Sequence, residues 1–247
     1  MELRGKTALV TGGAVRIGRE LALALGENGV NVALHYGNSA AQAAETASNI
    51  RGMGWEVETF PADLSDASQA SGLMERVVQR FGQIDILVNS AAIFLPGGLN
   101  DTTEKNWDDH FNINLKSPFF LCRAFALHVG NQRQAAIVNI ADWRGTRPGS
   151  HYLAYTLTKS GIITLTQSLA QGLAPNIRVN AIAPGAILPP PGGTAADLAR
   201  RAEQIPLRRS GNPKEVARAL LYLLQTEFVT GQILFVDGGE RFVAADG

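Results

Sequence analysis

Tyr155 and Lys159 are four residues apart in a segment of helical periodicity, so both side chains are expected on one face of a helix. Such a pair could assist hydride transfer to a carbonyl or an imine, because the reduced group must also receive a proton. A tyrosine of ordinary pKa, near ~10, exchanges protons slowly at neutral pH, and a nearby ammonium would lower that pKa. The same spacing also occurs in purely structural helices.

A carboxylate, Asp142, lies thirteen residues before Tyr155, directly after the apolar run 135–141. At the carboxyl end of a strand, such an acid is either a helix-capping group or a functional acid. The residue type and its spacing leave both alternatives open.

A turn that contains glycines 12, 13 and 18 connects the first expected strand to the first expected helix, in the segment TGGAVRIG (residues 11–18). Free N–H groups at a helix N-terminus bind phosphate, and glycine permits positive φ and close approach of a ligand. A dinucleotide-binding fold lays its pyrophosphate at this place. An ordinary strand-to-helix connection is the alternative.

These segments resemble the short-chain dehydrogenase/reductase superfamily, whose fingerprint is Thr-Gly, three variable residues and then Gly-x-Gly. Arg16 stands in place of the middle glycine and Asp142 in place of a serine, and both departures match the pteridine reductase branch. The resemblance covers nearly the whole chain, through DL (63–64), NSAAIF (89–94), NAIAPGAI (180–187) and VDGG (236–239). It implies an α/β fold, a single Rossmann-type doubly wound domain over residues 1–247 with a seven-stranded parallel sheet flanked by helices.

The resemblance implies NADPH (NADP) as the cofactor. An NAD-binding fold has an acid at the end of its second strand, and that carboxylate would repel a 2′-phosphate. Here the segment LHYGNS (34–39) carries no acid, and Asn38 stands where pteridine reductases usually have arginine. The residues implied to bind the cofactor are Gly12, Arg16, Ile17, Gly18, His35, Tyr36, Asn38, Ser39, Asp63, Leu64, Asn89, Ser90, Ala91, Lys159, Pro184, Gly185 and Ile187.

A flat ring is the implied substrate, because Phe94 matches the phenylalanine that stacks on the pterin in pteridine reductases. Asn114 matches the asparagine that holds a relay water behind the lysine. The implied catalytic residues are Asp142, Tyr155, Lys159 and Asn114. The implied substrate-binding residues are Arg16, Phe94, Asp142, Tyr155 and Leu188, with a lid at about residues 188–205.

Short apolar runs that alternate with helical patterns must position these groups around a parallel sheet. Strands are expected at 7–11, 31–36, 56–61, 84–89, 135–141, 178–183 and 232–236. Helices are expected at 17–28, 40–52, 67–81, 103–129, 152–173 and 213–224.

The composition excludes several classes of function. A chain of 247 residues, 45% of them hydrophobic, can form one large α/β domain. The formal net charge of +0 and the lack of a basic run argue against nucleic acid as a partner. The lone Cys122 offers neither a disulfide nor a metal cluster, so no metal site is expected. Without a leader or an apolar run of membrane length, we expect a cytoplasmic protein with no membrane partner.

The predicted reaction is reduction of a pteridine or a dihydropterin/dihydrofolate-like ring by NADPH. Hydride reaches a ring carbon, while Tyr155, with Asp142 and bound water, protonates the adjacent nitrogen. Two alternatives stay open: a carbonyl reductase of 3-oxoacyl-type ketones and a catalytically silent protein that binds or senses NADPH. By resemblance, the helices around Asn114 and Tyr155 would form the interfaces of a homotetramer or dimer.

Overall fold

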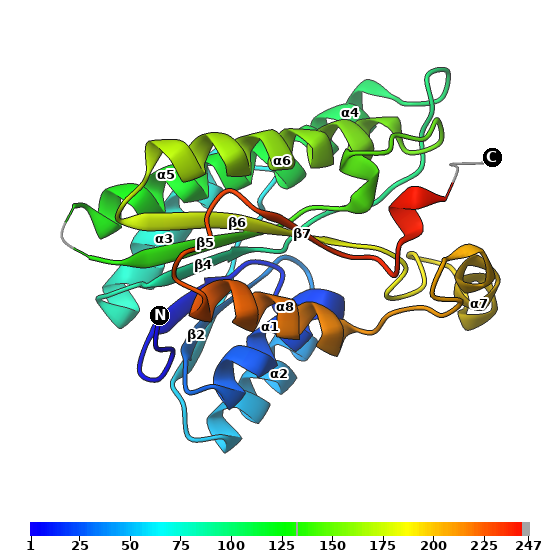
Figure 1. Cartoon of the computed structure of the whole chain (residues 1–247). Helices are drawn as coiled ribbons and strands as arrows, with labels where there is room; N and C mark the ends of the chain where they lie inside the picture. Colours follow the sequence, from blue (N-terminus) through cyan, green and yellow to red (C-terminus); the bar gives the residue numbers. More distant parts are fainter. Residues whose placement is uncertain (132, 244–247) are drawn as a thin grey trace.

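One sheet of seven parallel strands runs through the centre of the computed structural model, which describes residues 1–131 and 133–243 (Figure 1). The strands are β1 (Thr7–Val10), β2 (Asn31–Tyr36), β3 (Val57–Pro61), β4 (Ile86–Asn89), β5 (Ala135–Ile140), β6 (Ile177–Pro184) and β7 (Ile233–Val236). They lie in the order β3-β2-β1-β4-β5-β6-β7, and each neighbouring pair is parallel. The predicted Rossmann-type α/β fold is confirmed.

Helices cover both faces of this sheet (Figure 1). On one face, apolar side chains of α1 (Arg16–Glu27), α2 (Ala40–Gly52) and α8 (Pro213–Gln225) form a core with the strands. On the other face, α3 (Ala67–Phe81), α5 (Ser117–Val129) and α6 (Leu153–Gly172) form a second core. Because both faces are covered, the central strands β1 and β5 are buried along their whole length. No helix within residues 1–131 and 133–243 is long and apolar enough to cross a membrane.

The single helix expected over residues 103–129 is divided into three parts. They are α4 (Glu104–Phe111), the π-helical turn η1 (Asn112–Lys116) and α5. Pro118, in the first turn of α5, has no N–H to donate to the carbonyl of Asn114 four residues earlier. The wider π turn accommodates this missing bond, and turns of this kind are frequent at functional sites.

The expected lid at 188–205 contains a helix that the sequence interpretation missed, α7 (Ala195–Gln204). Its N-terminus is a capping box, in which Thr194 and Asp197 each hydrogen bond to the backbone of the other. In Figure 1 this helix lies apart from the sheet, near the short C-terminal helix η3 (Glu240–Phe242). Arg201 of α7 pairs with the buried Glu240 of η3, so the two segments are joined.

Candidate active site

A cavity of about 970 Å³ lies at the carboxyl ends of strands β1 to β6. In an open parallel sheet, this edge is the usual place for a ligand. Most residues implied by the resemblance line the cavity. These are Gly12, Arg16, Ile17, Gly18, His35, Asn38, Asp63, Leu64, Ser90, Ala91, Phe94, Asp142, Tyr155, Lys159, Pro184, Gly185, Ile187 and Leu188.

Four other residues of the expected site do not line this cavity. Tyr36 packs against the core beneath α1 and α2, and Ser39 is the residue before α2. Asn89 is buried and donates to Asn139 Oδ1 at 2.9 Å. Asn114 is buried as well, and its contacts are described below.

The glycine turn between β1 and α1 has the shape that a dinucleotide phosphate needs. A Cβ atom at Gly12, where φ is +65°, would lie 2.9 Å from the Cα of Ala91. A Cβ atom at Gly18 would lie 2.1 Å from the carbonyl oxygen of Gly12. Val15 precedes α1 and supplies no side-chain hydrogen bond to its first turn. The backbone therefore closes tightly around the cavity and leaves N–H groups for an anion.

Arg16 occupies the fingerprint position where the superfamily has glycine, and its φ is 54°. That left-handed conformation costs a non-glycine residue of order 1–2 kcal/mol. Its guanidinium donates from Nη2 to the carbonyl oxygen of Pro189 at 2.6 Å. The strained residue thus connects the glycine turn to the first part of the lid, and such strain is typical of functional sites.

The imidazole of His35 supports the turn from behind. Its Nδ1 accepts from the N–H of Gly12 at 3.1 Å, and its Nε2 lies 3.0 Å from the carbonyl oxygen of Ala62. A carbonyl only accepts, so Nε2 carries the proton and the ring is neutral. Both nitrogens are engaged with the backbone, so His35 lines the cavity as a support of the turn and has no free ring N–H to offer a 2′-phosphate.

Acid is expected to weaken the fold through His35. Burial lowers the pKa of His35 from 6.5 to about 4, so the folded state resists its protonation. Because the pKa of His35 is lower in the folded chain than in the unfolded chain, the neutral imidazole stabilises the fold at pH values above 6.5. That stabilisation is lost as the pH falls from 6.5 toward 4. Between about pH 7.5 and pH 5 this contribution falls by roughly 2 kcal/mol.

Denaturant unfolding of the wild-type chain and of His35→Asn at several pH values measures this loss. The difference between their pH slopes isolates His35 from the other titrating groups. Equal slopes for the two proteins would show that the histidine is not buried as a neutral acceptor.

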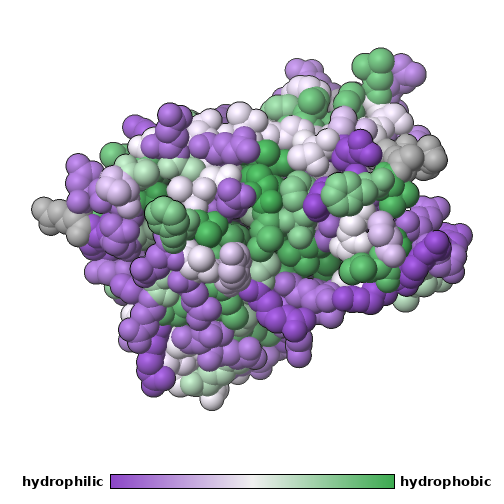
Figure 2. Space-filling model, viewed as in Figure 1, coloured by the Kyte–Doolittle hydropathy of each residue, from purple (hydrophilic) through white to green (hydrophobic). Residues whose placement is uncertain are grey.

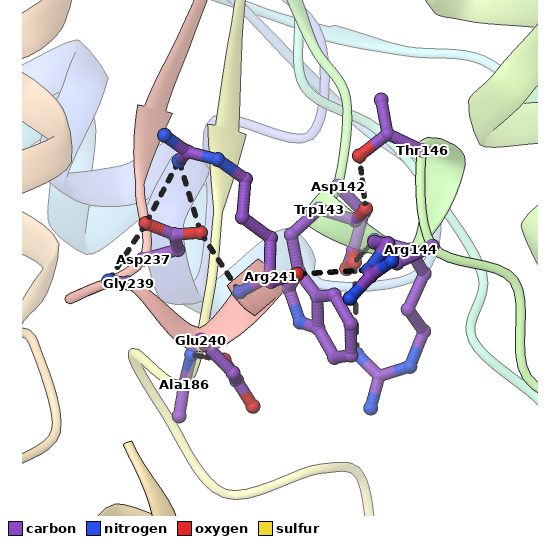
Figure 3. A network of polar contacts seen from close by, with 10 residues as sticks. Asp142, Trp143, Arg144, Thr146, Ala186, Asp237, Gly239, Glu240 and Arg241 are labelled. Atoms are coloured by element: carbon purple, nitrogen blue, oxygen red, sulfur yellow. Dashed lines mark hydrogen bonds and ion pairs between the residues drawn. The ribbon is translucent and has the colours of Figure 1, made fainter. Parts of the chain in front are cut away.

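The phenol of Tyr155 and the carboxylate of Asp142 are in direct contact, with Oη donating to Oδ2 at 2.9 Å. Asp142 follows β5 and begins the 3₁₀ turn η2 (Trp143–Gly145), where its Oδ1 accepts from the N–H of Arg144 at 2.8 Å. The Arg144 guanidinium lies 3.6 Å from the same oxygen (Figure 3). Asp142 is therefore both a capping group and the hydrogen-bond partner of the tyrosine.

Lys159 and Tyr155 are both buried, with Lys159 Nζ 5.5 Å from the centre of the phenol ring. Nζ donates to the carbonyl oxygen of Ile140 at 2.7 Å. Burial lowers the pKa of Lys159 to about 8, although Asp142 raises it. Burial, followed by Asp142, raises the pKa of Tyr155 well above 10.0. The expectation of a lowered tyrosine pKa is wrong here, because burial and the carboxylate outweigh nearby positive charge.

Phe94 gives the cavity an aromatic wall. Its ring lies parallel to that of Tyr152, with centroids 4.2 Å apart, and edge-on to that of Tyr155 at 4.6 Å. The Arg144 guanidinium carbon is 5.6 Å from the Phe94 centroid. A flat ring beside Tyr155 would therefore have an aromatic neighbour and a cation within reach.

The side chain of Asn114 holds the loop that carries Phe94. Its Oδ1 accepts from the N–H of Ile93 at 2.9 Å, and its Nδ2 donates to the carbonyl oxygen of Ile93 at 3.0 Å. A second contact joins Nδ2 to Thr158 Oγ1 at 3.4 Å, beside Lys159. In this arrangement Asn114 positions other residues and does not face the cavity.

Sequence interpretation missed three groups at this site. Arg144 and Arg201 line the cavity, and the ring of Tyr152 stacks on Phe94. Arg144 lies two residues beyond the strand-end acid, a position that favours contact with it. The capping box Thr194-x-x-Asp197 was the local signal for the helix that carries Arg201.

Residues 13–240 match the family model described as Enoyl-(Acyl carrier protein) reductase. The 3-oxoacyl-[acyl-carrier-protein] reductase FabG of Staphylococcus aureus is 35% identical over 239 residues, which cover 95% of this chain and 97% of that protein. FabG of Thermotoga maritima is 35% identical over 244 residues, which cover 97% of this chain and 99% of that protein.

A solved structure with a similar fold is FolM alternative dihydrofolate reductase 1 from Brucella suis, in complex with NADP. Its TM-score is 0.94 and its sequence identity 33%, over 100% of this chain and 98% of that chain. A short chain dehydrogenase from Burkholderia cenocepacia was also solved in complex with NADP. Its TM-score is 0.90 and its sequence identity 32%, over 97% of this chain and 99% of that chain.

Proposed function

Because this chain belongs to the short-chain dehydrogenase/reductase superfamily, we propose that it is an NADPH-dependent reductase of a pteridine or dihydropterin/dihydrofolate-like ring. The observation that carries the proposal is the contact of the Tyr155 hydroxyl with Asp142 beside the ring of Phe94. Serine, the usual superfamily residue at this position, could not accept hydrogen bonds as a carboxylate does.

NADP fits the part of the cavity that lies against the glycine turn. Gly12 and Gly18 leave room only for backbone, and the start of α1 is free of a side-chain cap. No carboxylate follows β2 to repel a 2′-phosphate. The FolM and dehydrogenase structures that resemble this chain were solved with NADP. When bound, NADPH supplies the hydride.

Residues of this chain would supply the proton and the orientation. The raised pKa keeps Tyr155 as a hydroxyl, which is the form that gives a proton to an imine nitrogen. The Asp142 carboxylate can accept from N–H groups of the ring, while Phe94 packs against it. Lys159 would hold the ribose hydroxyls and offset the negative charge that the tyrosine acquires. Hydride and proton together reduce the C=N double bond to a C–N single bond, with one new C–H bond and one new N–H bond.

The pH dependence of catalysis is expected to follow Lys159. Its pKa of about 8 means that the ammonium is present below pH 8 and is lost above it. The value of kcat/KM for NADPH, which reports the free enzyme, should be level below pH 8 and fall roughly tenfold per unit above. Tyr155 does not titrate in this range, because its pKa is raised further. A profile without a limb between about pH 7 and pH 9 would contradict this role of Lys159.

The FabG relatives favour a second candidate function, the reduction of a 3-oxoacyl thioester. Tyr155 and Lys159 would serve a ketone as well as an imine, with Asp142 as a substitute for serine. The steady-state rate of NADPH oxidation should therefore be measured with each of these substrates in turn: dihydrobiopterin, dihydromonapterin, dihydrofolate and a 3-oxoacyl thioester. We expect turnover of the dihydropterins. No turnover of any pterin would overturn the proposal, and NADPH binding without any turnover would support a sensing role.

Self-association is proposed through the outer face of α5 and α6. Phe119 and Leu127 on α5 are 44% and 72% exposed, and Leu157 on α6 is 41% exposed. A further apolar surface lies over the edge strand β7, in the middle of Figure 2, where each strand residue is partly exposed. Light scattering should give the mass of a dimer or tetramer, and Leu127→Lys should lower it. A monomeric mass at micromolar concentration would contradict this expectation.

A further inference from the structure

Phe94 lies in a loop, residues 90–96, that has no regular secondary structure. The loop nevertheless supplies the aromatic wall of the cavity. A loop keeps one shape when the polar groups of its backbone are bonded to the rest of the fold. Beyond its end, Gly97 forms a parallel bridge with Tyr152, whose ring stacks on Phe94. The contacts that hold this loop therefore decide where the wall stands.

Three side chains, each four residues after the one before it on α4 and η1, hydrogen bond to the backbone of this loop: Asn106, His110 and Asn114. Asn106 Nδ2 donates to the carbonyl oxygen of Pro96 at 3.2 Å. His110 Nε2 accepts from the N–H of Leu95 at 3.3 Å. Asn114 bonds to both backbone groups of Ile93. One face of the helical segment thus holds the residues on both sides of Phe94.

His110 is the central member of this set and is fully buried, with 0% of its surface exposed. Its Nδ1 lies 2.7 Å from the carbonyl oxygen of Asn106. A carbonyl only accepts, so Nδ1 carries the proton and Nε2 is left to accept from Leu95. The imidazole also lies edge-on to the ring of Tyr155, with centroids 6.3 Å apart. His110 therefore lies beside both the loop of Phe94 and the proton donor.

The separation of Phe94 and Tyr155 decides which ligand can lie between the wall and the phenol. The centroids of these two rings are 4.6 Å apart. Phe94 is partly exposed and lines the cavity, so a shift of its loop would move the surface that a ligand meets. A misplacement of about 1 Å in a group that positions a substrate is enough to weaken binding or catalysis.

We propose that His110 is a positioning residue for the substrate, because it fixes Phe94 at the distance from Tyr155 that a flat ring needs. This inference rests on the proposed reduction of a pterin ring. The cofactor end of the loop is held separately, since Thr11 Oγ1 accepts from the N–H groups of Ser90 and Ala91 at 2.9 Å and 3.1 Å. Loss of the His110 contact should therefore weaken ring binding and leave NADPH binding intact.

His110→Phe keeps an aromatic ring and removes both polar contacts. It is expected to raise KM for the dihydropterin that the wild type reduces fastest about tenfold. The wall packs on the ring in the ground state and the transition state alike, so kcat should change less than about threefold. The dissociation constant of NADPH should change less than about twofold. His110→Gln keeps an acceptor near the position of Nε2 and should bring KM to within about threefold of the wild-type value.

The matched control is His128→Phe. His128 Nε2 also accepts from a backbone N–H, that of Ile84 at 3.2 Å, and His128 does not line the cavity. The same chemical change at this position should leave KM and kcat at their wild-type values.

A double-mutant cycle with Phe94→Leu separates positioning of the wall from general damage to the fold. The Phe94→Leu protein has no aromatic wall, so adding His110→Phe to it should change KM less than about twofold. Asn106→Ala, at a partly buried position on the same helix face, should raise KM about threefold. If His110→Phe does not fold, Asn106→Ala and its own cycle with Phe94→Leu decide by the same criteria.

Three results would each overturn the inference and leave the pterin reaction standing. They are an unchanged KM, a fall in kcat without a rise in KM, and a rise in KM that persists in the Phe94→Leu background. If the wild-type chain reduces no pterin, the proposed function fails, and the same variants are compared by binding of 2,4-diaminopteridine. Calorimetry in the presence of NADP then gives the dissociation constants. Weaker binding by His110→Phe, lost as a difference in the Phe94→Leu background, supports the positioning role. Equal binding, or no binding by the wild type, rejects it.

Discussion

Tyr155→Phe is expected to lower kcat for dihydropterin reduction by roughly 10² to 10⁴-fold, the usual contribution of a positioned proton donor. The substitution removes the only hydroxyl that bonds to Asp142 Oδ2 among the described contacts, and it keeps the ring that packs edge-on against Phe94. The dissociation constant of NADPH should therefore stay within about twofold. Stopped-flow and steady-state measurements of NADPH oxidation give the rate, and NADPH fluorescence titration gives the affinity.

A matched control for this experiment is Tyr222→Phe. Tyr222 lies on α8, is 52% exposed and does not line the cavity. It should retain the wild-type rate. A Tyr155→Phe enzyme with near wild-type kcat would mean that the proton comes from another group, such as a bound water, and would remove the tyrosine from the mechanism.

Asp142→Ser is expected to lower kcat/KM for dihydropterins about 100-fold, which corresponds to the loss of a charged hydrogen bond of roughly 3 kcal/mol. The serine restores the usual superfamily residue and removes the carboxylate that raises the pKa of Tyr155. Turnover of a 3-oxoacyl thioester should therefore hold or increase. The turnover of both substrates should be measured with the Asp142→Ser protein. Loss of pterin turnover alone indicates a change of specificity, whereas loss of both activities indicates that Tyr155 no longer functions.

The control for this substitution is Asp108→Ser, which changes an exposed acid on α4 that does not line the cavity. It should alter neither activity. If Asp142→Ser leaves pterin turnover unchanged, the carboxylate acts as a cap of η2 and not as a ligand of the ring. Wild-type turnover of a 3-oxoacyl thioester that exceeds the turnover of every pterin, and that survives Asp142→Ser but is lost in Tyr155→Phe, would favour the carbonyl reductase alternative.

Much of the fold could be predicted from sequence because its signals are local. Strands that are buried on both faces are short apolar runs, and β1 and β5 have that pattern. The signal for the glycine turn is equally local, because the backbone around Gly12 and Gly18 leaves no room for a side chain at either position. For the same reason, Tyr155 and Lys159 could be placed together from their spacing on one helix.

The features that sequence missed depend on contacts between distant segments. His35 was expected among the cofactor-binding residues, and both of its ring nitrogens are engaged by the backbone of Gly12 and Ala62, which are 23 and 27 residues away. The raised pKa of Tyr155 depends on burial, which spacing does not reveal. The division of helix 103–129 has a local cause in Pro118, which has no N–H to donate to the carbonyl of Asn114.

The most direct measurement of ring reduction is NMR of the product formed with NADPH that carries deuterium at C4 of the nicotinamide. We predict that the deuterium appears at the former imine carbon of the dihydropterin, next to the ring nitrogen that takes its proton from Tyr155. The account is contradicted if no deuterium enters any pterin and the label appears instead at the alcohol carbon of a reduced 3-oxoacyl substrate.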